Sequence, residues 1–219
     1  MDEAKAVDEK PILFSGSMVR AILDGVKTQT RRVCKPAIWK LLNEIERANG
    51  KPCWQCLDFD VNCPWEFDQL WVRETWYQLG RYSMPPWDGA DDEDATWSGT
   101  KKVKYAATCE LGSEDARPGQ AYRPFWRKRP SIHMPRWASR LDLKVKGIRV
   151  ERVQRISTKD ALAEGVDYAE PNDGEWYDPI EHFRLLWDSI NAKRGYEWNR
   201  NPWVWVIDFK VAEQQSYKA

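Results

Sequence analysis

The stretch Met18-Val-Arg-Ala-Ile-Leu-Asp-Gly25-Val-Lys-Thr-Gln-Thr-Arg-Arg-Val33 predicts three structural elements in direct succession. Its first seven residues place apolar side chains at helical spacing, behind a Ser-Gly-Ser turn that offers an N-cap. Gly25 stands where such a helix ends, because glycine adopts the left-handed conformation at little cost. Residues 26–33 are β-branched and basic, which predicts a strand that leaves the turn.

Four further strands and three further helices are expected outside this stretch. Alternating apolar residues predict strands at 10–14, 69–76, 140–156 and 202–209. Capping residues and helical spacing predict helices at 39–48, 160–164 and 178–190. The last helix is expected to bury one face, made of Ile180, Phe183, Leu186, Trp187 and Ile190. The order favours the α+β class, as a small mixed β-barrel or strongly bent sheet with helices packed outside.

The region from about 80 to 130 shows no clear period and is expected to be irregular. It contains an acidic run without a compensating base, at Asp88, Asp91, Asp92, Glu93 and Asp94. Because a structureless stretch of this length does not form core, we expect a Trp-rich insertion at about 77–135 that borders a site. The predicted organisation is a disordered lead at 1–10, a single domain at 11–210 that includes the insertion, and a tail at 211–219.

Composition excludes several classes of protein. The 219 residues carry 34 basic and 34 acidic side chains, so net charge gives no general affinity for polyanions. No apolar run approaches the roughly 20 residues of a membrane helix, and the polar start MDEAKAVDEK lacks the apolar core of a signal peptide. A cytoplasmic, globular protein is therefore expected.

The cysteines suggest reduced thiols rather than a metal centre. Five are present, and three of them cluster as Cys53-x-x-Cys56 and Cys63. A second CxxC is missing, so plain thiols are the preferred interpretation and a zinc site is the alternative. The sequence predicts no metal and no cofactor.

Charge is distributed unevenly along the chain. Between Arg117 and Arg155 there are 12 Lys or Arg and two acids, whereas between Asp160 and Asp188 there are nine acids and one Arg. Aromatic residues are interleaved with the basic ones, a pattern that suits phosphate contact with base stacking. Residues 117–155 are therefore a candidate nucleic-acid surface, and the alternative is that the two charged segments meet each other in space.

The stretch Gly25-Val-Lys-Thr-Gln-Thr-Arg-Arg32, placed after an amphipathic helix, resembles the signature of the ASCH domain family. Asp68-Gln-Leu-Trp-Val72, Ala163-Glu-Gly-Val166 and the closing Trp203-Val-Trp-Val-Ile-Asp-Phe209 resemble three further pieces of that family. Arg127–Arg140 is similar to a stretch found in larger ASCH proteins of bacteriophages and prophages. The resemblance implies a PUA-like barrel that binds RNA or modified bases, and it does not cover the insertion.

The resemblance also implies a chemistry, because one bacterial enzyme of the family removes the acetyl group from N4 of N4-acetylcytidine. Its motif places the catalytic residues on Lys27, Thr30 and Glu164 of this chain. Thr30 is then the nucleophile, Lys27 the base and Glu164 the acid or orienting group. Arg32 follows the threonine as a substrate-binding residue.

Amide hydrolysis by this set makes one geometric demand. A threonine hydroxyl is inert until a base takes its proton, and a lysine acts as a base only when its pKa is depressed. In a straight strand Lys27 and Thr30 point to opposite faces, so they meet only if residues 25–28 form a turn or bulge.

Other residues are candidates for contact with the substrate. Trp71 and Trp76 are expected to line the cleft or the core, and His133 to touch a base or phosphate. Ser15 and Gly16 offer backbone amides after the first strand. The favoured function is hydrolysis of an N4-acyl group from cytidine or a related modified nucleoside. The alternatives are a non-catalytic reader of RNA or modified bases, and a phage protein that binds a host factor through its acidic 88–94 segment.

Overall fold

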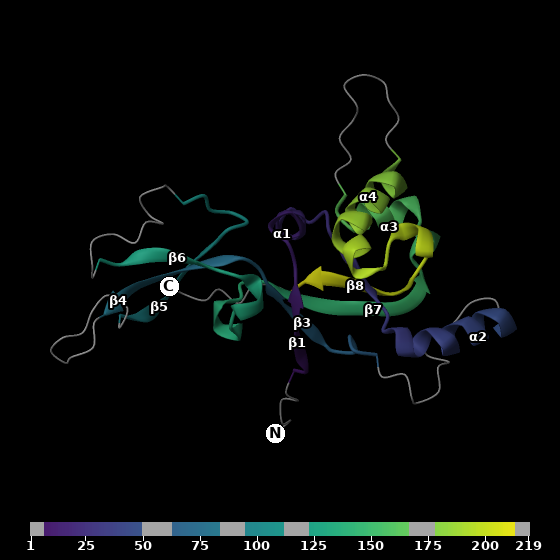
Figure 1. The fold of residues 1–219 in the computed structure, drawn as a ribbon, viewed down its shortest axis with the longest axis horizontal. Coiled ribbons are helices and arrows are strands. Elements are labelled where there is room, and N and C mark those ends of the chain that lie inside the picture. The colour runs from purple at the N-terminus through teal and green to yellow at the C-terminus, as the bar shows by residue number, and fades with distance from the viewer. Residues whose placement is uncertain (1–6, 50–62, 84–94, 112–122, 167–177, 213–219) are drawn as a thin grey trace, which may run out of the picture. The chain divides into compact units, whose positions relative to one another are not determined.

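The computed structural model describes residues 7–49, 63–83, 95–111, 123–166 and 178–212. They form a mixed α+β fold with two sheets (Figure 1). The helices are α1 (Gly16–Leu23), α2 (Trp39–Asn49), α3 (Thr158–Ala163) and α4 (Pro179–Asn191). The strands are β1 (Glu9–Leu13), β2 (Gln29–Val33), β3 (Gln69–Arg73), β4 (Trp76–Ser83), β5 (Thr96–Tyr105), β6 (Phe125–Arg129), β7 (Asp142–Arg152) and β8 (Trp203–Val211).

The larger sheet has the strand order β1-β3-β7-β8-β2, which leaves β2 at an edge. β8 pairs antiparallel with both β7 and β2, and the β7 register shifts between Val145 and Gly147, where the sequence pattern also breaks. Among the described residues, strand pairing closes neither sheet into a barrel. The α+β class is confirmed at this level.

Contacts divide the chain into two compact units. The first contains residues 21–70 and 143–215, with β2, β7, β8, α2, α3 and α4. The second contains residues 11–20 and 71–142, with the sheet β5-β4-β6. The expected insertion at 77–135 lies wholly within the second unit.

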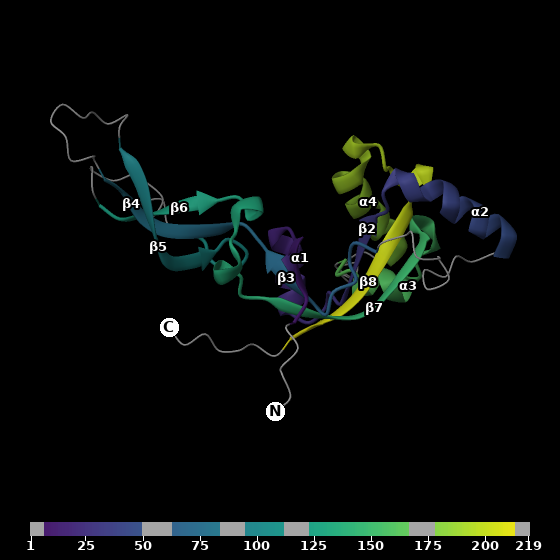
Figure 2. The same ribbon diagram turned by 90° about the horizontal axis from the view of Figure 1, so that it is seen from below.

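Each face of the β7-β8-β2 layer packs against its own apolar cluster, because alternate residues point to opposite faces. On one face Val204 and Val206 pack with α3 and α4 residues, including Phe183 and Trp187. On the other face Trp203 and Trp205 pack with α2 and neighbouring residues, and this cluster includes Cys34, Leu42, Cys63 and Val150. Figures 1 and 2 show α3 and α4 on one side of this layer and α2 on the other.

The predicted start of α4 and most of its predicted buried face are confirmed. Asp178 caps α4 by accepting a hydrogen bond from the Ile180 amide, and Pro179 stands at its first turn. Phe183 and Trp187 are buried as predicted, whereas Ile190 is 45% exposed and was wrongly placed on the buried face. The described helices include none that is both long and apolar enough to cross a membrane.

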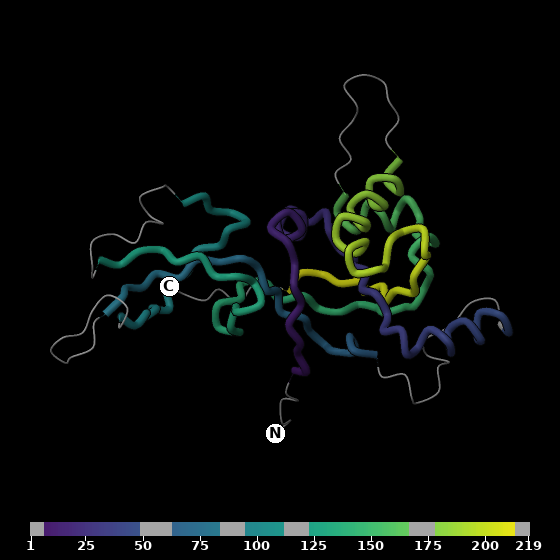
Figure 3. Tube along the Cα trace, in the orientation of Figure 1, coloured from purple at the N-terminus to yellow at the C-terminus, as the bar shows by residue number. Residues whose placement is uncertain are grey.

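The expectation of an irregular region from 80 to 130 is wrong for the part of it that the structure describes. β4 extends to Ser83, and it pairs antiparallel with β5 on one side and β6 on the other. The three strands form one sheet, and Figure 3 follows the path of the chain through them. The sequence hides them because lysine, glycine and serine interrupt the apolar alternation. The acidic residues 88–94 lie outside the described residues, as do the last seven residues of the tail. The expected lead at 1–10 is partly structured, since β1 begins at Glu9.

Candidate functional site

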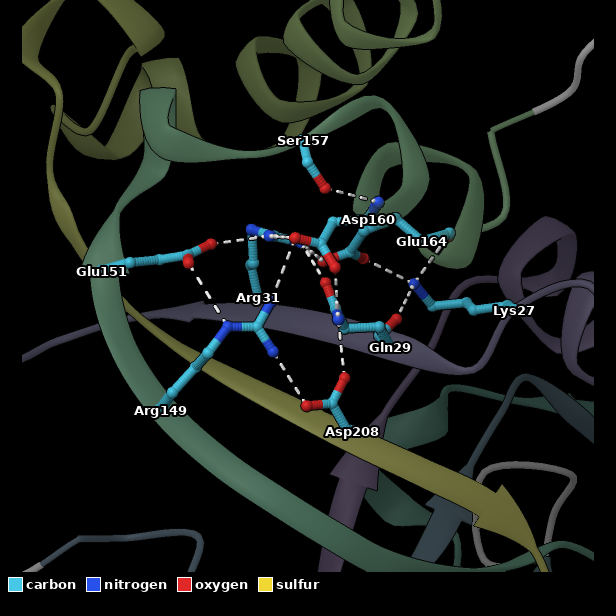
Figure 4. Close-up of polar contacts among 9 residues, drawn as sticks. All are labelled: Lys27, Gln29, Arg31, Arg149, Glu151, Ser157, Asp160, Glu164 and Asp208. Atoms are coloured by element: carbon cyan, nitrogen blue, oxygen red, sulfur yellow. Dashed lines mark hydrogen bonds and ion pairs between the residues drawn. The ribbon is translucent and has the colours of Figure 1, made fainter. Parts of the chain in front are cut away.

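Lys27 lies in the turn between α1 and β2, and its side chain is fully buried. Gly25 has a φ of +74°, which permits the tight turn, and β2 begins only at Gln29. The Nζ atom donates to the Gln29 carbonyl oxygen at 2.8 Å and to the Glu164 carbonyl oxygen at 2.7 Å. It also lies 2.7 Å from Glu164 Oε2, as Figure 4 shows. Each of its three N–H groups therefore has an acceptor.

The lysine ammonium sits beside the free edge of β2 rather than above one face of it. The Phe209 amide of β8 donates to the Thr28 carbonyl. Because successive carbonyls of a strand point to opposite sides, the Gln29 carbonyl points away from β8. Lys27 Nζ, which binds that carbonyl, lies against the peptide bond that joins Gln29 to Thr30. Residues 25–28 thus form the turn that the sequence required, and this turn brings Lys27 Nζ to the backbone carbonyl of Gln29.

Glu164 is brought to this edge by a short helix with defined ends. Ser157 caps α3 by accepting from the Asp160 amide at 3.1 Å, and Glu164 is the C-terminal cap residue. The Thr28 amide donates to the Ala163 carbonyl at 2.8 Å, which joins the helix end to the β2 turn. Gly165 follows with a φ of +78°, and a Cβ there would lie 2.9 Å from Lys27 Cβ. Glycine at 165 therefore lets the helix end approach the lysine.

Arg31 makes a second cationic contact to Glu164. Its Nη1 atom donates to Glu164 Oε1 at 3.1 Å and to Gln29 Oε1 at 2.6 Å. Its Nη2 atom donates to Glu151 Oε1 at 2.6 Å. The Nε atom is buried and has no hydrogen-bond partner within the described part of the chain. Glu164 thus shares its two carboxylate oxygens between two buried cations.

A second layer of polar contacts surrounds Arg31 and reaches the surface. Gln29 Nε2 donates to Asp160 Oδ1 at 3.0 Å and to Asp208 Oδ1 at 2.6 Å. Arg149 donates to Asp208 Oδ2 at 2.8 Å and lies 3.1 Å from Asp160 Oδ2. Figure 4 shows these side chains converging from β2, β7, β8 and α3. Arg149 of the basic segment and Asp160 of the acidic segment therefore meet in space, as the structural alternative for the charge distribution expected.

Burial dominates the electrostatics of the edge site. Removal from water lowers the pKa of Lys27, and the nearby charges of Arg32 and Arg31 lower it further, whereas Glu164 opposes the change. Burial likewise lowers the pKa of Arg32 to about 10, and Arg194 adds to that effect. A lysine with a depressed pKa is the kind that serves as a proton acceptor.

Thr30 and Arg32 point to the face of β2 opposite Gln29 and Arg31. Thr30 is 3% exposed, and its Cα pairs with Ile207 of β8. Arg32 pairs with Trp205. Of the predicted catalytic set, the structure joins Lys27 directly to Glu164, and it places Thr30 next to the peptide that Lys27 contacts.

The other predicted substrate-binding residues belong to the second unit. Trp71 and Trp76 are 7% and 1% exposed, and Trp76 packs with Met134 and Ala138 as core. His133 and Ser15 are exposed there, and Gly16 begins α1. Lys27 and Glu164 belong to the first unit.

Sequence reasoning missed most of the polar network around Glu164. It did not single out Gln29, Arg31, Arg149, Glu151, Asp160 or Asp208 as site residues. One signal was present, because Gln29 and Arg31 alternate on a short strand and both are polar. Their acidic partners are more than 100 residues away, and only the fold identifies them.

The zinc alternative is not tested at two of its positions, because Cys53 and Cys56 lie outside the described residues. Cys34 and Cys63 are buried free thiols, and burial raises the pKa of Cys34. The described residues contain no group of three or more His, Cys, Asp or Glu side chains placed to hold a metal ion.

Comparisons of the chain with protein-family models, with curated proteins and with solved structures find no match. The residues at the edge of β2 therefore carry the functional proposal. Their distinctive feature is the fully buried Lys27, which pairs with the Glu164 carboxylate and contacts the peptide bond between Gln29 and Thr30.

Proposed function

We propose that this chain is an ASCH-like protein that hydrolyses an N4-acyl group from cytidine or a related modified nucleoside. The observation that carries the proposal is the buried Lys27–Glu164 pair against the Gln29–Thr30 peptide. Of the three residues that resemble the family's catalytic lysine, threonine and glutamate, Lys27 and Glu164 are in direct contact, and Thr30 follows the carbonyl group that Lys27 binds. In this proposal the five-stranded sheet is the PUA-like core.

The chemistry begins with a proton transfer at the β2 edge. Burial lowers the pKa of Lys27 and so favours its neutral amine, and in this proposal that amine takes the proton of the Thr30 hydroxyl. The Thr30 oxygen then attacks the acyl carbon and forms a tetrahedral oxyanion. Collapse breaks the bond between the acyl carbon and N4, and the Lys27 ammonium returns its proton to the departing amine.

Water completes the cycle. A water molecule attacks the acyl-threonine ester, Lys27 accepts one of its protons, and the carboxylic acid leaves as Thr30 regains its hydrogen. Glu164 holds Lys27 Nζ in place throughout, through its Oε2 atom and its backbone oxygen. Arg32 contributes positive charge near the developing oxyanion.

The test is incubation of the purified chain with N4-acetylcytidine, followed by chromatography for cytidine. Wild type is expected to release cytidine, while Lys27→Met and Thr30→Val lose at least about 100-fold in rate. Thr28→Val is the matched control, because Thr28 is exposed and its hydroxyl has no role in the mechanism. Release of cytidine by Thr30→Val at the wild-type rate contradicts the proposed nucleophile.

A non-catalytic reader of modified bases is the second candidate. It is favoured by the hydrogen bonding of Lys27, because all three of its N–H groups already have acceptors within the protein. Hydrogen bonds of this kind favour the charged ammonium over the neutral amine. A reader binds N4-acetylcytidine or another modified base without turnover. Binding that survives in Thr30→Val, together with no cytidine from wild type, supports this second function.

A further inference from the structure

The three strands of the sheet β5-β4-β6 contain seven cationic residues and no acidic one. The cations are Arg81, Lys101, Lys102, Lys104, Arg127, Lys128 and Arg129. Elsewhere in the described chain, ion pairs neutralise arginines such as Arg31 and Arg140. On this sheet, however, no carboxylate of the described residues lies within ion-pair distance of Arg81, Lys101 or Arg127. Such a surface complements a polyanion.

The same strands are rich in aromatic rings, and three of these form a cluster on one face. Tyr82 pairs with Trp97 across β4 and β5, with ring centroids 5.5 Å apart. Phe125 of β6 lies 6.0 Å from Tyr82 in a stacked arrangement and 5.1 Å from Trp97. Tyr82 is 37% exposed, so the cluster presents a ring to solvent.

Glycines of the sheet bring this cluster close to the backbone. A Cβ at Gly80 would lie 2.5 Å from the Trp97 ring, so the indole lies flat on β4 only because residue 80 is glycine. The Trp97 Nε1 atom is buried and has no hydrogen-bond partner among the described residues. The platform is therefore built from rings that pack against backbone and against one another.

Cations lie beside aromatic rings on both faces of this sheet. The Arg127 guanidinium is 5.3 Å from the Trp97 ring centroid. On the opposite face, where strand alternation places Trp126, Lys104 Nζ lies 4.7 Å from the ring centroid of that residue. Lys101 and Lys102 are exposed on β5. A surface that combines the exposed Tyr82 ring with neighbouring cations matches a chain of bases and phosphates, since bases stack on rings and phosphates meet cations.

From this arrangement we propose that the β5-β4-β6 sheet binds single-stranded nucleic acid. A single strand is the favoured occupant because its bases are free to stack, whereas those of a duplex are already stacked on one another. The proposal does not depend on the chemistry at Lys27. The acidic residues at 88–94 lie outside the described residues, and the three strands themselves contain no acidic residue.

The first experiment measures fluorescence anisotropy of a labelled single-stranded RNA of about twelve nucleotides, a length within the usual site sizes. Binding is expected to weaken by roughly 50-fold between 50 and 200 mM salt if four phosphates are neutralised. Lys101→Glu with Lys102→Glu is expected to weaken it by at least about 10-fold. The matched control is Lys35→Glu with Lys40→Glu, which makes the same charge change at exposed lysines of the other unit.

The second experiment separates stacking from simple charge attraction. Tyr82→Ala is expected to lose roughly 5-fold or more in affinity, and Tyr82→Phe is expected to keep it. Tighter binding of a duplex of the same sequence, equal competition by inorganic polyphosphate, or equal losses in the two lysine pairs each overturn the proposal. The variant with Lys101→Glu and Lys102→Glu is also assayed for hydrolysis of free N4-acetylcytidine. This assay reports on the site at Lys27 and not on RNA binding, so the two proposals can fail independently.

Discussion

Lys27 Nζ contacts Glu164 twice, at the backbone oxygen and at Oε2, with both distances 2.7 Å. The two residues are 137 positions apart in the chain, and this pair joins the end of α3 to the edge of β2. Because neither side chain is exposed to water, their mutual contact satisfies charges that would otherwise be costly to bury. The same pair serves both the stability and the proposed chemistry of the chain.

Removing the carboxylate is expected to destabilise the protein strongly. Glu164→Ala leaves Lys27 and Arg31 buried without their shared partner, and losses of about 3–5 kcal/mol are typical of such changes. Urea denaturation measures the free energy of unfolding. Arg200→Ala is the control, since its ion pair with Glu197 is exposed and is expected to contribute under about 1 kcal/mol. Equal losses in the two variants would show that the buried pair contributes no more to the free energy of unfolding than an exposed pair.

A comparison of two glycines with the same backbone conformation separates the cost of a steric clash from the cost of backbone strain. Gly165 and Gly195 have φ values of +78° and +81°, so alanine at either position adopts a strained backbone. A Cβ at 165 meets Lys27 Cβ at 2.9 Å, whereas a Cβ at 195 has nothing within 4 Å. Gly165→Ala is therefore expected to cost about 1–3 kcal/mol more than Gly195→Ala in thermal or urea unfolding. A smaller cost at 165 contradicts the tight approach of α3 to Lys27.

Asp160 is expected to contribute to acid sensitivity. Burial acts to raise the pKa of its carboxyl, but hydrogen bonds from Gln29 and Ser157 and the charge of Arg149 outweigh it and hold the pKa below its ordinary value. Because the folded-state pKa is the lower one, the stabilisation is present above the ordinary value of 3.8 and is lost as pH falls through the folded pKa.

The variant Asp160→Asn tests that effect. It is expected to flatten the fall in unfolding free energy below about pH 4, by under about 1 kcal/mol because the side chain is partly exposed. The measurement is urea denaturation at a series of pH values. An unchanged acid slope would show that Asp160 does not titrate differently in the folded and unfolded states.

The proposed base predicts a pH dependence of turnover. Burial lowers the pKa of Lys27 from 10.5, so the neutral amine fraction, and with it kcat, rises with pH and levels off below that value. Lys27→Arg is expected to be inactive across the range, because a guanidinium does not give up its proton. A rate that is independent of pH from 6 to 10 contradicts the assignment of Lys27 as the base.

The sequence predicted elements whose signals are local. The glycine stop after α1, the Ser157 cap of α3 and the Asp178 cap of α4 all lie where nearby residues place them. The resemblance to the ASCH family implies Lys27 and Glu164 as site residues, and the structure places the two side chains in contact. Trp203 and Trp205 lie on one face of β8 and Val204 and Val206 on the other, as strand alternation requires.

What the sequence did not predict depends on distant partners. The sheet β5-β4-β6 contains Gly80, Gly99 and several lysines, so its strands lack the apolar alternation that marks a strand with one buried face. Ile190 has helical spacing with Phe183 and Trp187 but lies at the exposed border of α4. The network of Arg149, Asp160 and Asp208 forms only when β7, α3 and β8 meet.

The most direct test of the edge site is to quench wild-type protein with acid during incubation with N4-acetylcytidine, and to analyse both nucleoside and protein. Cytidine in solution, together with an acetyl group on the peptide that contains Thr30, is the predicted result. The acetylated peptide is expected to be absent in Lys27→Met and present in the Thr28→Val control. Absence of cytidine, or cytidine without any acetylated Thr30 in wild type, would contradict an edge site that acts through Lys27 and Thr30.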